Sequence, residues 1–422
     1  MTPANRPKIL LVHPDLFYGA VHSPPLTSLV RSLPDFDFVI MTPLPPEGES
    51  RGSWPPNVSF VGLPGRWLDR LGRRLPGAAG RIAGIPNELW KAFAYHRLAR
   101  TEPGDLVHVH MGLEVENLMR VGRKLRLPVL WQLARALNDL RSVGKPVVLT
   151  EHSLFSRRSE LGFPNPLHEA DLLVTSPYPN VICVDRDSYG YLGRRDAQAR
   201  IRRNRWYIPN GIDTTRFAFA PHPPRDTLTL GYSGRLFRSG ESPTFLPQVA
   251  ARLPHGVELR LAVATTMPVD EVRRRWFSNA PVVVHRNIPN DEMPSFYTGI
   301  DLLVNPYLWG GVGRNSLEAM SCGRPVMMFD NADHYPVTRE TGYLIPPDDT
   351  EAFLSLVAGF RNDRESLAAR GRRARDVVVG EFDERIVANS TSKVYGSLLA
   401  DPLSPSEPRG PKKRSGPTSR AG

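Results

Sequence analysis

The amino-acid sequence predicts an α/β protein made of two doubly wound domains, each a parallel sheet with helices on both faces. Three observations predict this fold class. The chain has 422 residues, which is enough for two to three domains of about 150 residues each. Short apolar runs alternate with helical stretches, as is typical of parallel α/β architecture. The runs fall into two sets, separated near 217–226 by Pro221, Pro223 and Pro224.

The apolar runs are nearly continuous Val, Ile and Leu, which is typical of strands buried on both faces. They lie at 8–12, 36–41, 58–63, 106–110, 147–150 and 181–184, and then at 229–233, 258–263, 282–285, 302–305, 326–329 and 343–345. We therefore expect an N-terminal domain over 1–218 and a C-terminal domain over 219–400, whose last helix covers about 381–399. Residues 401–422, rich in Pro, Ser and Gly, predict a disordered basic tail.

Composition excludes several classes of protein. No stretch reaches the roughly 18–20 apolar residues that a membrane-spanning helix needs. The first residues do not form a secretory signal, and Cys183 and Cys322 are too few for a disulfide framework or a cysteine zinc site. We therefore expect a cytoplasmic protein.

The formal net charge is +11, and most of the 54 basic residues are Arg. Arginine suits phosphate because its planar fork binds two oxygens at once, although a compositional bias of the coding DNA explains the excess equally well. The charge favours anionic partners without choosing one. The basic tail could bind nucleic acid, but such tails are usually only solvated, so we expect no nucleic-acid partner.

The segment 301–325 has the most features of a binding site. A strand runs into a loop containing Gly311 and Gly313, and a short helix follows from about Asn315. Glycines before a helix let backbone N–H groups and the positive helix end approach a phosphate. Arg314 and Glu318 flank the helix start, so we expect an anion site; a simple tight turn is the alternative. Glu318 could accept hydrogen bonds from a ribose, or could merely stabilise the helix dipole.

A second loop follows the first strand of the C-terminal domain. Gly234 permits a close approach of the backbone, and Arg235 could bind a diphosphate, unless it is an ordinary surface arginine. Arg238, three residues on, is another candidate. Because ligands bind at the carboxyl ends of parallel strands, we expect both loops to contribute to one site.

The N-terminal domain offers polar residues at the ends of its strands. His152 follows a buried strand and could bind a ligand hydroxyl or act in acid–base chemistry. His108 and His110 point to one face of another strand and could hold a metal, but no third ligand is evident. The pair Asp185 and Asp187 could bind a divalent ion; its spacing also arises easily by chance.

Four segments together resemble glycosyltransferase family 4, which has the GT-B fold of two Rossmann-like domains facing a central cleft. They are IPNGIDTTRF at 208–217, SGRL at 233–236, LEAMSCGRPV at 317–326 and GYLIP at 342–346. The resemblance covers roughly residues 8–400. It implies a retaining hexosyltransferase that uses a nucleotide sugar of the UDP or GDP type and a hydroxyl acceptor, with no separate cofactor and no required metal.

The resemblance also implies roles for single residues. Arg235 matches the arginine that holds the donor diphosphate, Glu318 the glutamate that takes the ribose hydroxyls, and His152 the histidine near the transferred sugar. Gly19 matches the glycine loop under the diphosphate. Two departures from the family pattern are Gly310, where a glutamate that contacts the donor sugar is usual, and Gly240 or Glu241, where a lysine is usual.

These departures keep a second function open, a catalytically inactive protein that binds sugar or nucleotide. A metal-dependent transferase using Asp185 and Asp187 would leave the second set of strands unexplained, and a nicotinamide oxidoreductase would need its glycine fingerprint in a first strand–helix turn. Arginines alternate with apolar residues over 66–82, so peripheral contact with the inner face of an anionic membrane is a further hypothesis.

Overall fold

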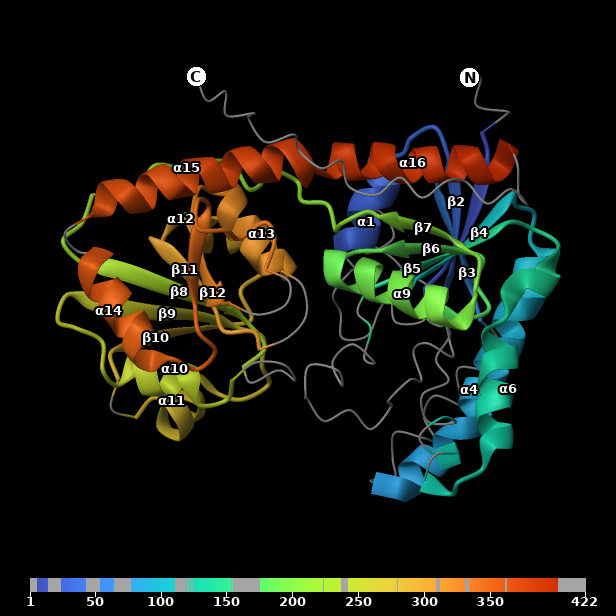
Figure 1. The fold of residues 1–422 in the computed structure, drawn as a ribbon, viewed down its shortest axis with the longest axis horizontal. Helices are drawn as coiled ribbons and strands as arrows, with labels where there is room; N and C mark the ends of the chain where they lie inside the picture. Colours follow the sequence, from blue (N-terminus) through green and yellow to red (C-terminus); the bar gives the residue numbers. More distant parts are fainter. Residues whose placement is uncertain are drawn as a thin grey trace, which may run out of the picture. The chain divides into compact units, whose positions relative to one another are not determined.

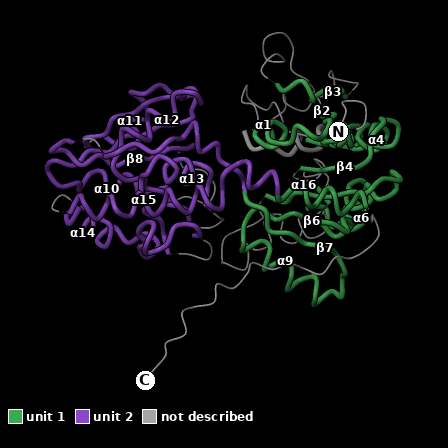
Figure 2. The backbone as a smooth tube through the Cα atoms, turned by 90° about the horizontal axis from the view of Figure 1, so that it is seen from above, with its two compact units in different colours: residues 1–209, 390–422 green, residues 210–389 purple. Residues whose placement is uncertain are grey.

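The computed structural model divides the chain into two compact units, which Figure 2 colours separately. Unit 1 comprises Met1–Pro209 and Ser390–Gly422, and unit 2 comprises Asn210–Asn389. The structure describes the residues 6–13, 24–42, 54–63, 77–110, 119, 121–122, 124–152, 154, 175–222, 224–236, 242–278, 280–308, 312–330, 334–360 and 363–400.

Unit 1 contains a parallel sheet of seven strands in the order β3-β2-β1-β4-β5-β6-β7, of which Figure 1 labels β2 to β7. The strands are β1 Lys8–Val12, β2 Asp37–Thr42, β3 Val58–Gly62, β4 Leu106–His110, β5 Val147–Glu151, β6 Asn180–Cys183 and β7 Asn204–Tyr207. All six apolar runs of the first set form strands here. The order reverses direction at β1, between β2 and β4, which is the arrangement of a doubly wound sheet.

Unit 2 repeats this topology with a parallel sheet of six strands in the order β10-β9-β8-β11-β12-β13. The strands are β8 Leu228–Gly234, β9 Val257–Val263, β10 Val282–Arg286, β11 Leu302–Asn305, β12 Val326–Phe329 and β13 Gly342–Ile345. Its first strand, β8, lies between β9 and β11, just as β1 lies between β2 and β4. The expected fold class, two doubly wound α/β domains, is confirmed.

Helices follow most strands. In unit 1 they are α1 Pro24–Arg31, α4 Gly77–Thr101, α6 Pro128–Asn138, the 3-10 helix η2 Leu140–Val143 and α9 Arg186–Ala199. In unit 2 they are α10 Phe245–Ala250, α11 Val269–Trp276, α12 Met293–Thr298, α13 Arg314–Ser321, α14 Thr350–Phe360 and α15 Arg364–Glu381; the last helix, α16 Glu384–Ala400, contributes to both units. The expected final helix at 381–399 is thus α16, preceded by the separate helix α15.

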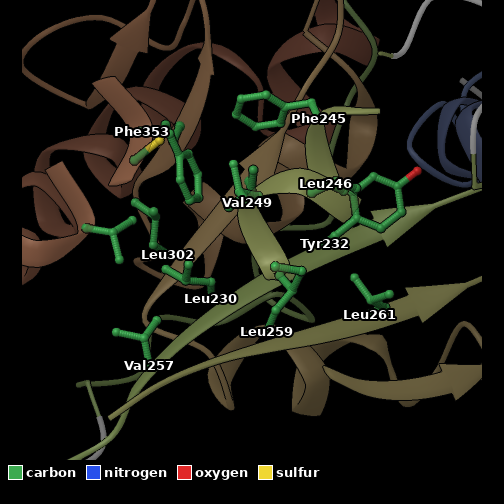
Figure 3. Packing of buried hydrophobic residues seen from close by; sticks show 14 of the residues in the cluster. Leu230, Tyr232, Phe245, Leu246, Val249, Val257, Leu259, Leu261, Leu302 and Phe353 are labelled. Atoms are coloured by element: carbon green, nitrogen blue, oxygen red, sulfur yellow. The ribbon is translucent and has the colours of Figure 1, made fainter. Parts of the chain in front are cut away.

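Successive residues of the unit 2 strands enter different cores. Leu302 and Val304 of β11 pack into a cluster with Phe245 and Phe353, part of which Figure 3 shows. Leu303, between them, packs on the other face with Met320 of α13. Side chains of a strand alternate between the two faces of a sheet, so apolar layers on both faces explain why every residue of β11 is apolar until Asn305.

The boundary between the units lies at Pro209/Asn210, whereas the sequence predicts domain ranges of 1–218 and 219–400. The segment 210–217 belongs to unit 2 because it pairs with the end of that unit's chain. Ile212 forms a parallel bridge with Asp383, and the Arg375 guanidinium donates to the carbonyls of Thr214 and Phe217. The partners of these contacts are far apart in the sequence, so the prolines at 221–224 do not indicate them. The predicted tail, 401–422, lies outside the described residues.

Candidate functional site

A hydrogen-bonded network lies at the carboxyl ends of β8 and β11 in unit 2. Its centre is Glu318 on α13, a carboxylate that is only 6% exposed. The Arg314 Nε donates to Oε1 of Glu318 at 2.8 Å, and the Tyr297 hydroxyl donates to Oε2 at 3.0 Å. The Tyr297 hydroxyl also lies 3.0 Å from the Ser233 Oγ at the end of β8. The network therefore joins three elements: β8, α12 and α13.

The start of α13 is fixed by the same region. Gly313 is the N-cap of the helix, and a Cβ atom there would lie 2.5 Å from Oδ1 of Asn315, so a larger residue would displace the Asn315 side chain. The Asn315 amide donates to the carbonyl oxygen of Ser233 at 2.7 Å. Asn305, at the end of β11, donates to the Ser316 hydroxyl at 2.6 Å. These contacts hold the helix N-terminus against the ends of both strands.

Two opposing effects act on the Glu318 carboxyl. Burial is the larger effect and raises the pKa of Glu318, because a charged carboxylate loses hydration; the nearby Arg314 charge and the hydrogen bonds from Tyr297 and Arg314 offset part of this rise. Burial and the neighbouring carboxylate also raise the pKa of the Tyr297 hydroxyl, which stays a neutral donor. The network thus presents a carboxylate with oriented donors.

Other predicted residues of unit 2 lie around this network. Gly234 ends β8, and Arg235 directly after it is exposed; among the described residues no carboxylate pairs with it. An exposed guanidinium at the end of the central strand is available to an anion. Arg238, Gly310 and Gly311 lie outside the described residues, as does Gly19 in unit 1.

In unit 1, four histidines gather at the carboxyl ends of three neighbouring strands. His13 follows β1, His108 and His110 lie on β4, and His152 follows β5. The rings of His13 and His110 stack with centroids 5.7 Å apart, and those of His108 and His110 are 4.3 Å apart. His152 Nε2 lies 3.5 Å from His110 Nδ1. We call these four residues the histidine cluster.

Burial holds the histidine cluster neutral. It lowers the pKa of His13 and His152 to about 4 and that of His108 to about 3, and it lowers the pKa of His110 well below its usual value. Mutual repulsion among the rings adds to this effect. His108 is held by the Tyr395 hydroxyl on Nδ1 and the Thr150 hydroxyl on Nε2, both at 2.6 Å.

The two aspartates considered for metal binding have a structural task. Asp185 is the N-cap of α9: its carboxylate accepts from the Ser188 backbone N–H at 2.6 Å and from the Ser188 hydroxyl at 2.8 Å. Asp187 lies in the first turn of the same helix. Among the described residues, no three His, Cys, Asp or Glu side chains are arranged to hold a metal ion.

Sequence reasoning singled out Glu318, Arg235, His152 and the start of α13, but it missed Tyr297, Ser233 as a side-chain partner, and His13. Tyr297 lies on α12 in an apolar setting, and its place beside Glu318 results from tertiary packing. His13 could have been found, since it directly follows the first buried strand. Among the described residues, no helix is both long and apolar enough to cross a membrane.

Comparison with known proteins finds similarity to glycosyltransferases over part of unit 2. Residues 227–363 match the family model described as "Glycosyl transferases group 1". A lipopolysaccharide core biosynthesis mannosyltransferase, LpsB, of Rhizobium meliloti is 36% identical over 221 residues, which are 46% of this chain and 60% of that protein. The chain therefore spans less than two thirds of this relative.

Solved structures resemble the whole chain. Sucrose-phosphate synthase from Thermosynechococcus elongatus aligns with a TM-score of 0.69 at 19% identity, covering 94% of this chain and all of that one. Anabaena HepE in complex with UDP-glucose aligns with a TM-score of 0.60 at 16% identity, covering 93% and 100%. At these identities the likeness establishes the fold alone: the chain has the GT-B fold of two Rossmann-like units.

Proposed function

We propose that this protein is a retaining glycosyltransferase of family 4 that moves a hexose from a nucleotide-activated donor to a hydroxyl acceptor. The observation that carries the proposal is the network around Glu318, a buried carboxylate with two oriented donors at the strand ends of unit 2. It lies inside the segment that matches the group 1 glycosyl transferases. The mannosyltransferase name of one relative and the UDP-glucose bound to HepE support a hexosyl nucleotide donor.

In the proposed complex, unit 2 binds the nucleotide. Glu318 accepts hydrogen bonds from the ribose hydroxyls, and the diphosphate lies against Arg235, the loop 310–314 and the N-terminus of α13. The exposure of Arg235 and the fixed position of the helix start support this placement. Helix N-termini favour anions because their backbone N–H groups point outward. Gly19, Arg238 and Gly311 stay predicted contacts of the donor.

The proposed mechanism rests on charge that develops at the leaving group. As the bond from sugar to phosphate breaks, negative charge grows on the diphosphate. Arg235 and backbone N–H groups already aimed there stabilise the transition state more than the ground state. The acceptor attacks from the leaving-group face and gives its proton to a phosphate oxygen, which retains the anomeric configuration. His152 binds the transferred sugar as a neutral imidazole, which its lowered pKa supports.

Transfer assays with UDP- and GDP-hexoses test this proposal, with the anomeric configuration of the product read by proton NMR. We expect retention, and activity that survives excess chelator. An inverted product would defeat the retaining mechanism, and activity restored only by a divalent ion would defeat metal independence. Nucleotide binding without transfer or donor hydrolysis would favour the alternative, an inactive sugar- or nucleotide-binding protein.

We also propose peripheral contact between unit 1 and an anionic membrane, at the inner face in a cytoplasmic setting. Residues 66–76 of the Arg-rich stretch 66–82 lie outside the described residues, but the start of α6 shows a similar pattern. There Leu125, Leu127 and Val129 are 56%, 42% and 60% exposed, and Lys124 and Arg126 beside them are exposed as well. Apolar side chains with adjacent cations suit an anionic lipid surface.

Flotation with phosphatidylglycerol vesicles at low salt tests this contact. The variant Leu127→Ser/Val129→Ser should float less than the wild type, while Val283→Ser, which changes an exposed valine of unit 2, should float equally well. Absence of flotation for the wild type would refute the contact.

A further inference from the structure

The lone pairs of Glu318 are partly occupied before any ligand binds. An ionised carboxylate has about four lone-pair sites, two on each oxygen. Arg314 occupies one on Oε1 and Tyr297 occupies one on Oε2. No other side chain or backbone donor among the described residues takes the second acceptor site on either oxygen. Two such sites match two hydroxyl donors on neighbouring carbons, as in a ribose.

The hydrogen bonds of the network run in one direction. An ionised carboxylate only accepts, so the single proton of the Tyr297 hydroxyl points to Glu318. The Ser233 hydroxyl lies 3.0 Å from the Tyr297 hydroxyl oxygen and therefore donates its hydrogen bond to that oxygen. A protonated Glu318 would present a donor of its own and would disturb this order. The arrangement therefore suits the charged form of Glu318.

Arg314 is held in place at two points. Its Nε bonds to Glu318, and its Nη1 donates to the Gly211 carbonyl at 3.1 Å. Its side chain is 20% exposed, so water screens its charge less than that of a surface arginine. A guanidinium engaged in this way is turned toward the carboxylate, which is a different task from binding the diphosphate.

We propose that Arg314 and Tyr297 are positioning residues that keep Glu318 ionised and aim its two free acceptor sites at a vicinal diol, the ribose of a nucleoside diphosphate. The inference rests on the proposed function for the identity of the ligand, and it concerns the two partners of Glu318. It makes preference for ribose over 2′-deoxyribose depend on a residue that does not touch the sugar.

A pH dependence follows from this arrangement. Four titratable or charged groups act on or near Glu318: Arg314 on the same helix, Tyr297 on α12, Arg216 of the segment 210–217, and Cys322 just after α13. Arg314 and Arg216 lower the pKa of Glu318, and burial raises it. Without Arg314 the effect of burial is less opposed, so Glu318 takes up a proton at higher pH and loses acceptor capacity.

The test compares Arg314→Met with two other variants of the full chain. Arg314→Lys keeps the positive charge but not the fork, and Arg216→Met removes a cation that forms no hydrogen bond with Glu318. Calorimetric titration with UDP, GDP and 2′-deoxy-UDP at pH 8 and pH 6 gives the affinities. In Arg314→Met we expect UDP affinity to fall more between pH 8 and pH 6 than in the wild type, because a protonated carboxyl offers fewer acceptor sites; the wild type measures the share that comes from protonation of the UDP phosphate itself, whose second pKa lies near 6. Arg216→Met should show a smaller change than Arg314→Met, because Arg216 acts on Glu318 by charge alone and more weakly than Arg314 does.

The preference for UDP over 2′-deoxy-UDP gives a second readout. It should be lost in Arg314→Met at pH 6, partly restored in Arg314→Lys, and reduced at both pH values in Tyr297→Phe, which aims the carboxylate less well but leaves the cation. A simple structural role would lower the affinity for both nucleotides equally. Equal pH profiles for Arg314→Met and the wild type would overturn the inference.

A ligand-free measurement separates this inference from the proposed function. Carbon-13 NMR of labelled glutamate, with Glu318→Gln identifying the signal, follows the titration of Glu318 itself. In Arg314→Met its midpoint should rise by at least about one pH unit, the usual scale for losing an adjacent opposite charge. Failure of every nucleotide to bind the wild type would reject the proposed ligand, whereas an unshifted Glu318 would reject the role of Arg314.

Discussion

The two units have sheets of the same strand order but end their strands in opposite kinds of chemistry. In unit 1, β1, β4 and β5 end in four histidines that burial holds neutral; three of them are buried and His152 is half-buried. In unit 2, β8 and the helix after β11 bring together an ion pair, Arg314 and Glu318, with Tyr297 and Ser233. Both sets lie where doubly wound sheets bind ligands.

This contrast indicates that the sheet topology determines where a ligand binds, whereas a few side chains at the strand ends determine which ligand binds there. Neutral imidazoles can donate to and accept from sugar hydroxyls without attracting charge. An ion pair beside an exposed arginine suits a nucleotide, which carries both hydroxyls and negative charge. The proposed division of labour, with sugar at unit 1 and nucleotide at unit 2, follows from this contrast.

Acid should distinguish the two units most strongly. The histidines have lowered pKa values in the folded state, so between pH 6.5 and about 4 only the unfolded chain binds their protons, and stability falls with falling pH. The loss in the free energy of unfolding approaches about 1.4 kcal/mol for each histidine over one pH unit. For four histidines this is roughly 5 kcal/mol per pH unit. In unit 2, Asp213, Asp301 and Asp383 have lowered pKa values, and their contribution is lost only below about their usual value of 3.8.

Hydrogen exchange read by mass spectrometry resolves the units by peptide and checks this prediction. Protection in β1, β4 and β5 should decline between pH 6.5 and 5, before protection in β8 and β11 does. His13→Gln should make the decline shallower by about 1.4 kcal/mol per pH unit. If protection declined at the same pH in both units, the proposed difference in acid sensitivity between them would be wrong.

The sequence predicted most of the fold because parallel strands buried on both faces are apolar throughout. Among the described strands, β7 alone does not coincide with a predicted apolar run. Its first residue, Asn204, is buried, but the residues up to Tyr207 are only half-buried, so they need not be apolar. The unit boundary was not predictable from local breakers: Asn210 to Phe217 belongs to unit 2 through contacts with Asp383 and Arg375.

The candidate site was predicted less completely. Loop position and resemblance singled out Arg235 and Glu318, because glycines and a helix start mark such sites locally. The partners of Glu318 are set by packing: Tyr297 comes from another helix, and Arg314 turns toward the carboxylate instead of outward. The stacking of His13 on His110 joins residues at the ends of two different strands, and no sequence spacing encodes it.

The variant His152→Ala tests whether unit 1 positions the transferred sugar. If unit 1 positions the sugar, turnover should fall by about a hundredfold, the scale of a misplaced reacting group, while nucleotide affinity changes by less than twofold. Steady-state kinetics with UDP titrated separately measure the two effects. A matched change, His255→Ala in unit 2, should leave both values near those of the wild type. Equal losses of affinity and turnover would assign His152 to nucleotide binding.

Arg235→Ala tests unit 2 in the opposite sense. Losing a charged hydrogen bond to the diphosphate should weaken nucleotide binding by roughly 1.5–3 kcal/mol. Arg252→Ala removes the same charge from another exposed position of unit 2, where Arg252 pairs with Glu351, and controls for net charge. Calorimetry with UDP and GDP measures both variants. The assignment of Arg235 fails if its affinity matches that of the control.

The smallest expected effect separates structure from metal chemistry in unit 1. Asp185 caps α9 through the backbone N–H and hydroxyl of Ser188. Asp185→Ala should therefore lower the free energy of unfolding by about 1 kcal/mol, while Asp185→Asn, an equally good cap, should be nearly neutral. Urea unfolding measures both variants. A metal ligand would behave differently, because Asn lacks the charge and would lose metal-dependent activity almost as fully as Ala does. Assays of both variants with excess chelator and with added Mn²⁺ distinguish these roles. If both variants lose Mn²⁺-dependent activity, Asp185 is a metal ligand and unit 1 binds a metal ion. If only Asp185→Ala loses stability and neither variant changes its response to Mn²⁺, Asp185 acts only as a helix cap.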